Sequence, residues 1–121
     1  MTKETLTIDL NNQDFKAKLV AIGFKEGNSH ILYIPSLKLS SYGDTIKEAH
    51  QMMKISLDAF AKDLFSLPVN KIHNFLAELG WEKHKYFRKR LQNLSQTTFE
   101  DIRKEFNLPE DIEVESYPIA V

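Results

Sequence analysis

The sequence predicts an α+β fold in which a small antiparallel sheet packs against one long helix. Apolar residues alternate over residues 5–10 and cluster in short runs over 18–34, as they do in strands. Between Thr45 and Phe65 they recur at spacings of three and four, which predicts a helix roughly 30 Å long. Alternation returns over residues 112–121. We therefore expect a sheet of three or four strands with a β-β-β-α-β core and a helical insertion before the last strand.

The length of 121 residues favours one domain over the whole chain, residues 1–121. Its core is expected over about 16–67, its helical addition over about 69–108 and its C-terminal strand over about 111–121. No internal repeat or linker interrupts it.

The N-terminal third predicts the first strands of the sheet. Leu6, Ile8 and Leu10 alternate with polar residues in a first half-buried strand. Residues 18–25 and 29–34 are the two arms of an antiparallel hairpin, joined by turn residues that include Gly27. A further strand begins near Leu37 and leads to Gly43.

The start of the long helix carries a clear set of signals. Thr45 and Glu48 have the spacing of a capping box, in which each side chain pairs with an amide of the first turn. Asp44 adds negative charge where the helix dipole is positive. Gly43 suits a backbone that swings from strand to helix, and we expect it to have a positive φ. Gly43, Asp44, Thr45 and Glu48 are thus predicted as the structural turn and helix cap.

Pro68 ends the long helix, and a second helix follows from Val69 to Leu79 with Gly80 after it. Residues 81–94 are expected to be irregular or to form a short helix. Thr97 and Glu100 predict a second capping box, which opens a short helix with its apolar side chains inward. Those side chains are Phe99, Ile102 and Phe106.

Charge is unevenly distributed along the chain. The net charge is −1, but residues 70–95 carry +4 and residues 96–121 carry −5. The stretch from Trp81 to Arg90 interleaves cations with aromatic rings, as phosphate contact and base stacking require. Two other interpretations stay open: a solvated face with its rings packed inward, or pairing with the acidic residues 110–115 or with a partner protein. The candidate contact residues are Trp81, Lys83, Lys85, Arg88, Lys89 and Arg90.

No catalytic or metal-binding pattern stands out, so we expect no cofactor and no enzyme activity. The chain has no cysteine, and its four histidines lack the spacing of metal ligands. No run of apolar residues is long enough to span a membrane, and a cytoplasmic location is expected.

Two motifs point to a family. Ile34-Pro35-Ser36-Leu37, followed by the Ser-x-Gly-Asp-Thr-x-x-Glu-Ala run from Ser41 to Ala49, resembles the core of HicB-like antitoxins over about residues 19–67. The resemblance implies a β-β-β-α-β core that binds and occludes a HicA-type ribonuclease toxin, and a homo-oligomer. Many members append an operator-binding domain, whereas only a strand is expected after Ile112. The alternative hypothesis is a nucleic-acid-binding module or transcriptional regulator that uses residues 81–90.

Overall fold

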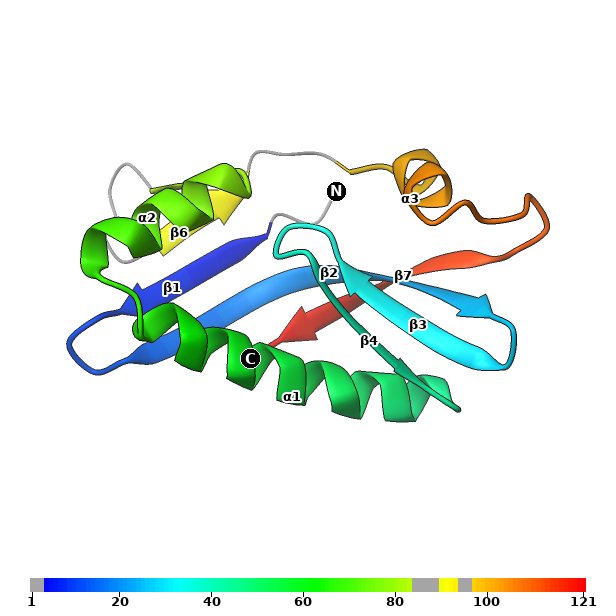
Figure 1. Cartoon of the computed structure of the whole chain (residues 1–121), viewed down its shortest axis with the longest axis horizontal. Coiled ribbons are helices and arrows are strands. Elements are labelled where there is room, and N and C mark those ends of the chain that lie inside the picture. The colour runs from blue at the N-terminus through cyan, green and yellow to red at the C-terminus, as the bar shows by residue number, and fades with distance from the viewer. Residues whose placement is uncertain (1–3, 84–89, 94–96) are drawn as a thin grey trace.

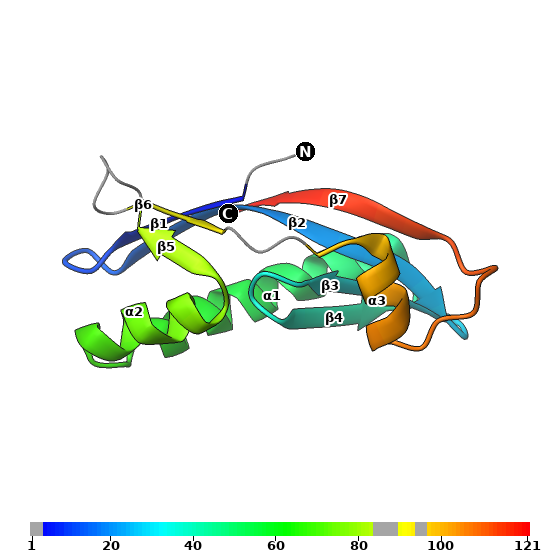
Figure 2. The same ribbon diagram turned by 90° about the horizontal axis from the view of Figure 1, so that it is seen from above.

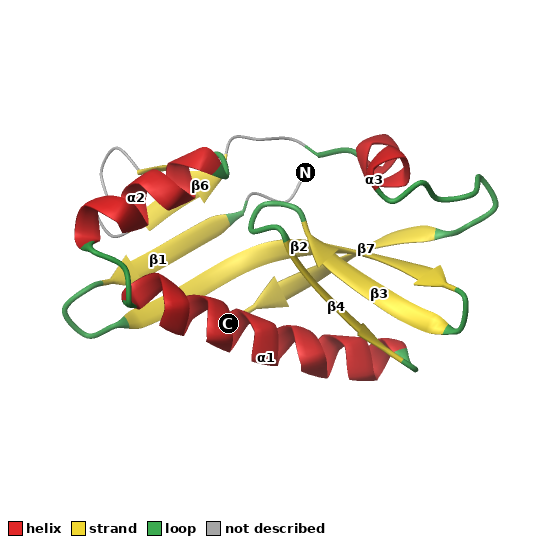
Figure 3. Ribbon diagram, in the orientation of Figure 1, coloured by secondary structure: helices red, strands yellow, loops and turns green. Residues whose placement is uncertain are grey.

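The computed structural model describes residues 4–83, 90–93 and 97–121, and it confirms an α+β fold with an antiparallel sheet (Figure 1). The sheet is larger than predicted, with seven strands rather than three or four, and three helices accompany it (Figure 3). In chain order the elements are β1 (Thr5–Asp9), β2 (Asp14–Glu26), β3 (Ser29–Ile34), β4 (Leu39–Gly43), α1 (Ile46–Phe65), α2 (Val69–Glu78), β5 (Trp81–Lys83), β6 (Arg90–Asn93), α3 (Phe99–Glu105) and β7 (Val114–Ala120).

The long strand β2 is the centre of the sheet and has partners on both edges. Ala17 exchanges two main-chain hydrogen bonds with Val121. The N–H and C=O groups of odd-numbered β2 residues therefore point towards β7, and those of even-numbered residues point towards the opposite edge of β2. On that other edge, β1 pairs with the first part of β2 and β3 with the last part. The strand order is β4-β3-β2-β1-β6-β5, with β7 on the opposite edge of β2.

Helices cover both faces of β2. The side chains of Ala17, Leu19 and Ala21 join the main core beneath α1 and α2. Ile22 and Phe24 point to the other face, where the ring centroid of Phe106 lies 5.1 Å from that of Phe24. Because both faces are covered there, the middle of β2 is a nearly continuous apolar run.

Helix α1 forms as predicted. Ala49, Met53, Leu57 and Leu64 are buried at helical spacing. The chain leaves the helix at Ser66, and Pro68 then directly precedes α2. Gly80, at φ 95°, ends this second helical segment in a conformation that favours glycine.

The predicted insertion is not purely helical. Residues 81–83 and 90–93 are strands β5 and β6, so the expectation of irregular structure or a short helix is wrong for them. They pair with each other, and β6 pairs with β1. Figure 2 shows α2 and β5 at the end of the molecule opposite to α3. Each strand is too short to show a period of its own, and its stability comes from the existing sheet.

The second capping box begins one residue later than predicted. The Thr98 hydroxyl accepts from the Asp101 amide at 3.2 Å, and the Asp101 carboxylate accepts from the Thr98 amide at 3.0 Å. Thr97 and Glu100 are therefore not the capping pair. With this start, Ile102 is buried but Phe99 is 45% exposed, so Phe99 does not point inward as predicted.

Candidate functional site

The predicted turn and cap lie together where β4 meets α1. The Thr45 hydroxyl accepts a hydrogen bond from the Glu48 amide at 3.1 Å, which supplies one half of the expected capping box. Asp44 is exposed just before it. The Ser41 hydroxyl donates to the Ala49 carbonyl at 2.8 Å and fastens the strand to the first turn. This junction is structural, and it fixes how β4 is presented at the border of the sheet.

The predicted positive φ at Gly43 is wrong, because Gly43 is not among the residues with left-handed backbone. Close approach explains the glycine instead. A Cβ atom here would lie 2.7 Å from the Ala49 amide nitrogen and 2.8 Å from the Glu48 Cβ. Since the nearest atom belongs to the backbone, a side chain at residue 43 would push the strand away from the helix.

The basic-aromatic segment does not form one surface in the part of the chain that the structure describes. Trp81 is only 2% exposed, and its indole N–H donates to the Ser36 carbonyl at 2.9 Å. Lys83 pairs with Leu91, so Lys83 and Arg90 lie on opposite faces of the sheet. Lys85, Arg88 and Lys89 lie outside the described residues.

A polar network connects Trp81 to the centre of the sheet. The Ser36 hydroxyl donates to Glu4 Oε2 at 2.8 Å, and the same oxygen accepts from the Val20 amide at 3.0 Å. Val20 lies between the stretches of β2 that pair with β1 and with β3, so its amide has no strand partner there. The Glu4 carboxylate satisfies an amide that would otherwise be costly to bury.

A basic face forms on the side of the sheet away from α1, and the sequence reasoning missed it. Lys16 lies opposite Thr7, which in turn lies opposite Arg90, and Lys18 lies opposite Thr5. These side chains line an open hollow of about 450 Å³. Alternation of Lys16 and Lys18 with buried residues was the available signal. Their proximity to Arg90 depends on the pairing of β6 with β1.

Acidic residues border the same face. On β5, Glu82 lies opposite Gln92 of β6, which itself lies opposite Thr5. At the other margin, Asp9 of β1 lies opposite Asp14 of β2, two residues before Lys16. The three cations therefore form a central strip with carboxylates at two margins. Such a strip can hold phosphates, while its hydroxyls can donate to the same oxygens.

An acidic border runs along the approach to β7 and its first residues. Its carboxylates are all exposed and belong to Glu110, Asp111, Glu113 and Glu115. Pro118 lies opposite Val20 at a position whose nitrogen points away from β2, so the missing N–H removes no bond from the ladder. The same proline removes one donor from the outer edge of β7.

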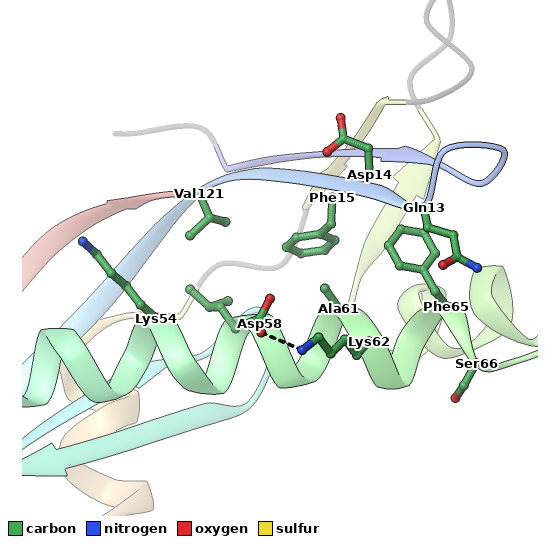
Figure 4. Close-up of a pocket in the computed structure, with 11 residues that line it drawn as sticks. Gln13, Asp14, Phe15, Lys54, Asp58, Ala61, Lys62, Phe65, Ser66 and Val121 are labelled. Atoms are coloured by element: carbon green, nitrogen blue, oxygen red, sulfur yellow. Dashed lines mark ion pairs between the residues drawn. The ribbon is translucent and has the colours of Figure 1, made fainter.

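A groove of about 740 Å³ lies between α1 and the beginning of β2 (Figure 4). Phe15 and Val121 form one wall, and Ala61 and Phe65 of α1 form the other. Charged side chains lie at its rim, where Lys62 pairs with Asp58 at 3.2 Å. The groove is open, and its lining is mixed in polarity.

His73, on α2, has a pKa that its surroundings lower. Partial burial and the nearby Lys83 ammonium lower its pKa below the usual 6.5. Its Nδ1 atom is buried without a hydrogen-bond partner. Within residues 4–83, 90–93 and 97–121, no three His, Asp or Glu side chains are placed to hold a metal ion.

No described helix combines the length and apolar character needed to cross a membrane. Comparison with protein-family models, curated proteins and solved structures finds no match for the chain.

Proposed function

We propose that this chain is a non-catalytic, antitoxin-like protein that binds and neutralises a HicA-type ribonuclease toxin. The observation that carries the proposal is the order and pairing of β2, β3, β4, α1 and β7. After β1, the strands β2, β3 and β4 run antiparallel into the long helix α1, and β7 returns to pair with β2. This order of elements supports the β-β-β-α-β core that the resemblance in residues 34–49 implies.

The acidic border at β7 supports the choice of partner. A ribonuclease must present a basic surface to hold phosphate, and complementary charge accelerates and orients protein association. Glu110 and Glu113 are exposed beside a sheet edge with unpaired main-chain groups. In the complex, these carboxylates would cover the cationic surface of the toxin, and the toxin would be unable to bind RNA.

Co-expression with a small basic ribonuclease encoded by the neighbouring gene tests the proposal. We expect restored growth and a complex that buries at least about 1,000 Å². Charge reversal by Glu110→Lys with Glu113→Lys should weaken the complex, whereas Glu78→Lys on α2 serves as a matched control. Growth arrest in the presence of folded protein, with no complex on size exclusion, would refute the antitoxin function.

A second candidate function is binding of nucleic acid, and the basic face favours it. Lys16, Lys18 and Arg90 come together with the hydroxyls of Thr5 and Thr7. Their arrangement suits contact with the phosphate backbone. Trp81 takes no part because it is buried.

Salt dependence of oligonucleotide affinity distinguishes this function from the first. Replacing Lys16 and Lys18 by Ala should reduce the slope of log affinity against log salt by nearly one unit per lost phosphate contact. Lys71→Ala, on α2, should leave the slope unchanged. Absence of binding by the unmodified protein at low salt would exclude this candidate.

A further inference from the structure

The outer edge of β4 is an open strand border. β4 is the last strand of its side of the sheet, and β3 is its partner. The alternation fixed by Ala17 and Val121 makes His30, Leu32 and Ile34 the residues of β3 that bond to β4. Ser40 and Tyr42 therefore direct their N–H and C=O groups away from β3. Both residues are exposed.

We propose that this edge pairs with the same edge of a second copy of the chain, antiparallel and around a two-fold axis at Ser41. In that register, Ser40 of each copy lies opposite Tyr42 of the other. Each such pair exchanges two main-chain hydrogen bonds, so the two sheets become one continuous sheet.

Charge complementarity favours this occupant. Lys38 lies in the left-handed turn just before β4, at φ 53°, and Asp44 lies just after the strand, so this register brings Lys38 of one copy near Asp44 of the other at both ends of the paired strands. Both side chains are exposed. Neither side chain forms an ion pair within the described part of the single chain. A two-fold axis thus forms two opposite-charge pairs, each joining Lys38 of one copy to Asp44 of the other.

Apolar surface lies on both sides of the proposed seam. Tyr42 is 71% exposed, and across the two-fold its ring would lie diagonal to its own counterpart, within reach for aromatic side chains. On the helix side, the His50 ring contacts Tyr117 of β7 at 5.2 Å and so identifies the β7 flank of α1. Met52 projects from the opposite flank, towards β4, and is 43% exposed.

The other long border of the sheet is unsuited to the same pairing. At β7, Pro118 lacks an N–H, and the exposed carboxylates of Glu113 and Glu115 lie at the start of the strand with no lysine or arginine within residues 110–121 to offset them. The two edges therefore differ in chemistry: β4 is flanked by charges of both signs, whereas β7 carries a proline and is flanked by carboxylates alone. Self-association at β4 leaves β7 available for a different partner.

Charge-reversal variants test the register directly, with sedimentation velocity as the measurement. We expect the unmodified chain to form a dimer and Lys38→Asp or Asp44→Lys to weaken it at least about tenfold, because two attractive pairs become repulsive. Mixing these two single variants should form a heterodimer with both pairs restored. Combining both substitutions in one chain should also restore the dimer, and Lys71→Glu on α2 should leave it unaffected.

Three results would overturn the proposal. The unmodified chain could remain a monomer at concentrations up to about 0.1 mM. The dissociation constant would then be too high for a specific dimer. A dimer could also persist in both single variants, which would place the interface elsewhere. Finally, weakened single variants that fail to associate when mixed would exclude this two-fold register. Circular dichroism and thermal unfolding of each variant show whether it is folded.

Discussion

At the residue scale, single atoms decide positions that the residue type alone leaves ambiguous. Gly43 is the clearest case, since its φ is not positive but the space beside its Cα is already occupied. The Ala49 amide nitrogen and the Glu48 side chain occupy the volume that a Cβ would need. Glycine is required there by the contact between strand and helix.

Gly43→Val should lower the free energy of unfolding by about 1–3 kcal/mol, because the added atoms must separate β4 from the first turn of α1. Urea unfolding measures the change. Ser40→Ala, on the exposed side of the same strand, is the control and should change stability by under about 0.5 kcal/mol. An unchanged midpoint for Gly43→Val would show that the junction can open without cost.

His73 predicts a pH dependence of stability. Its pKa in the folded protein is below 6.5 because burial and Lys83 disfavour the charged form. As pH falls below about 6.5, the unfolded chain takes up a proton that the folded chain resists, so the free energy of unfolding decreases. The contribution is complete above that pH and is lost progressively towards the folded-state pKa. His73→Gln should remove this part of the dependence between about pH 7.5 and pH 5.5. Equal pH dependence in both proteins would contradict the assignment.

At the scale of elements, α1 shows how a periodic pattern becomes an energetic difference between its faces. Met53 is fully buried, whereas Lys54 is exposed on the side that lines the groove. Met53→Ala should cost about 2–5 kcal/mol through the cavity that it leaves. Lys54→Ala should cost under about 0.5 kcal/mol. Chemical unfolding of the two variants checks this, and similar losses would mean that the faces of α1 are wrongly assigned.

The elements that the sequence predicts well are those with local signals. The cap at Thr45 and the helical period predict α1 within one residue, and alternation predicts β1 and the β2–β3 hairpin. β5 and β6 carry no such signal, because their three and four residues become strands by joining an edge formed by β1. Trp81 was ambiguous for the same reason: its partner, the Ser36 carbonyl, lies 45 residues earlier. Of the basic face, the sequence pattern indicates Lys16 and Lys18, which alternate with buried residues. Arg90 joins them only because β6 pairs with β1, which is a non-local contact.

At the scale of the whole molecule, the insertion and the core share their interactions. β6 extends the sheet from β1, and the side chain of Trp81 lies in the main core cluster. The hydrogen bonds from Trp81 to Ser36, from Ser36 to Glu4 and from Val20 to Glu4 connect four separate segments. Loss of the insertion would therefore expose core surface and leave the Ser36 carbonyl unpaired.

This connection predicts that the chain unfolds as one cooperative unit. Trp81 is the single tryptophan, so its fluorescence reports the environment of the insertion, while far-UV circular dichroism reports the helices and strands of the whole chain. Because the indole is buried in the common core, both signals should change over the same range of urea concentration and give the same free energy of unfolding. Ser36→Ala should shift both transitions together to lower urea, since it removes the hydroxyl that binds Glu4 and keeps the carbonyl that binds Trp81. A fluorescence transition that precedes the change in circular dichroism would show that β5 and β6 detach first, and the chain would then contain two units of different stability.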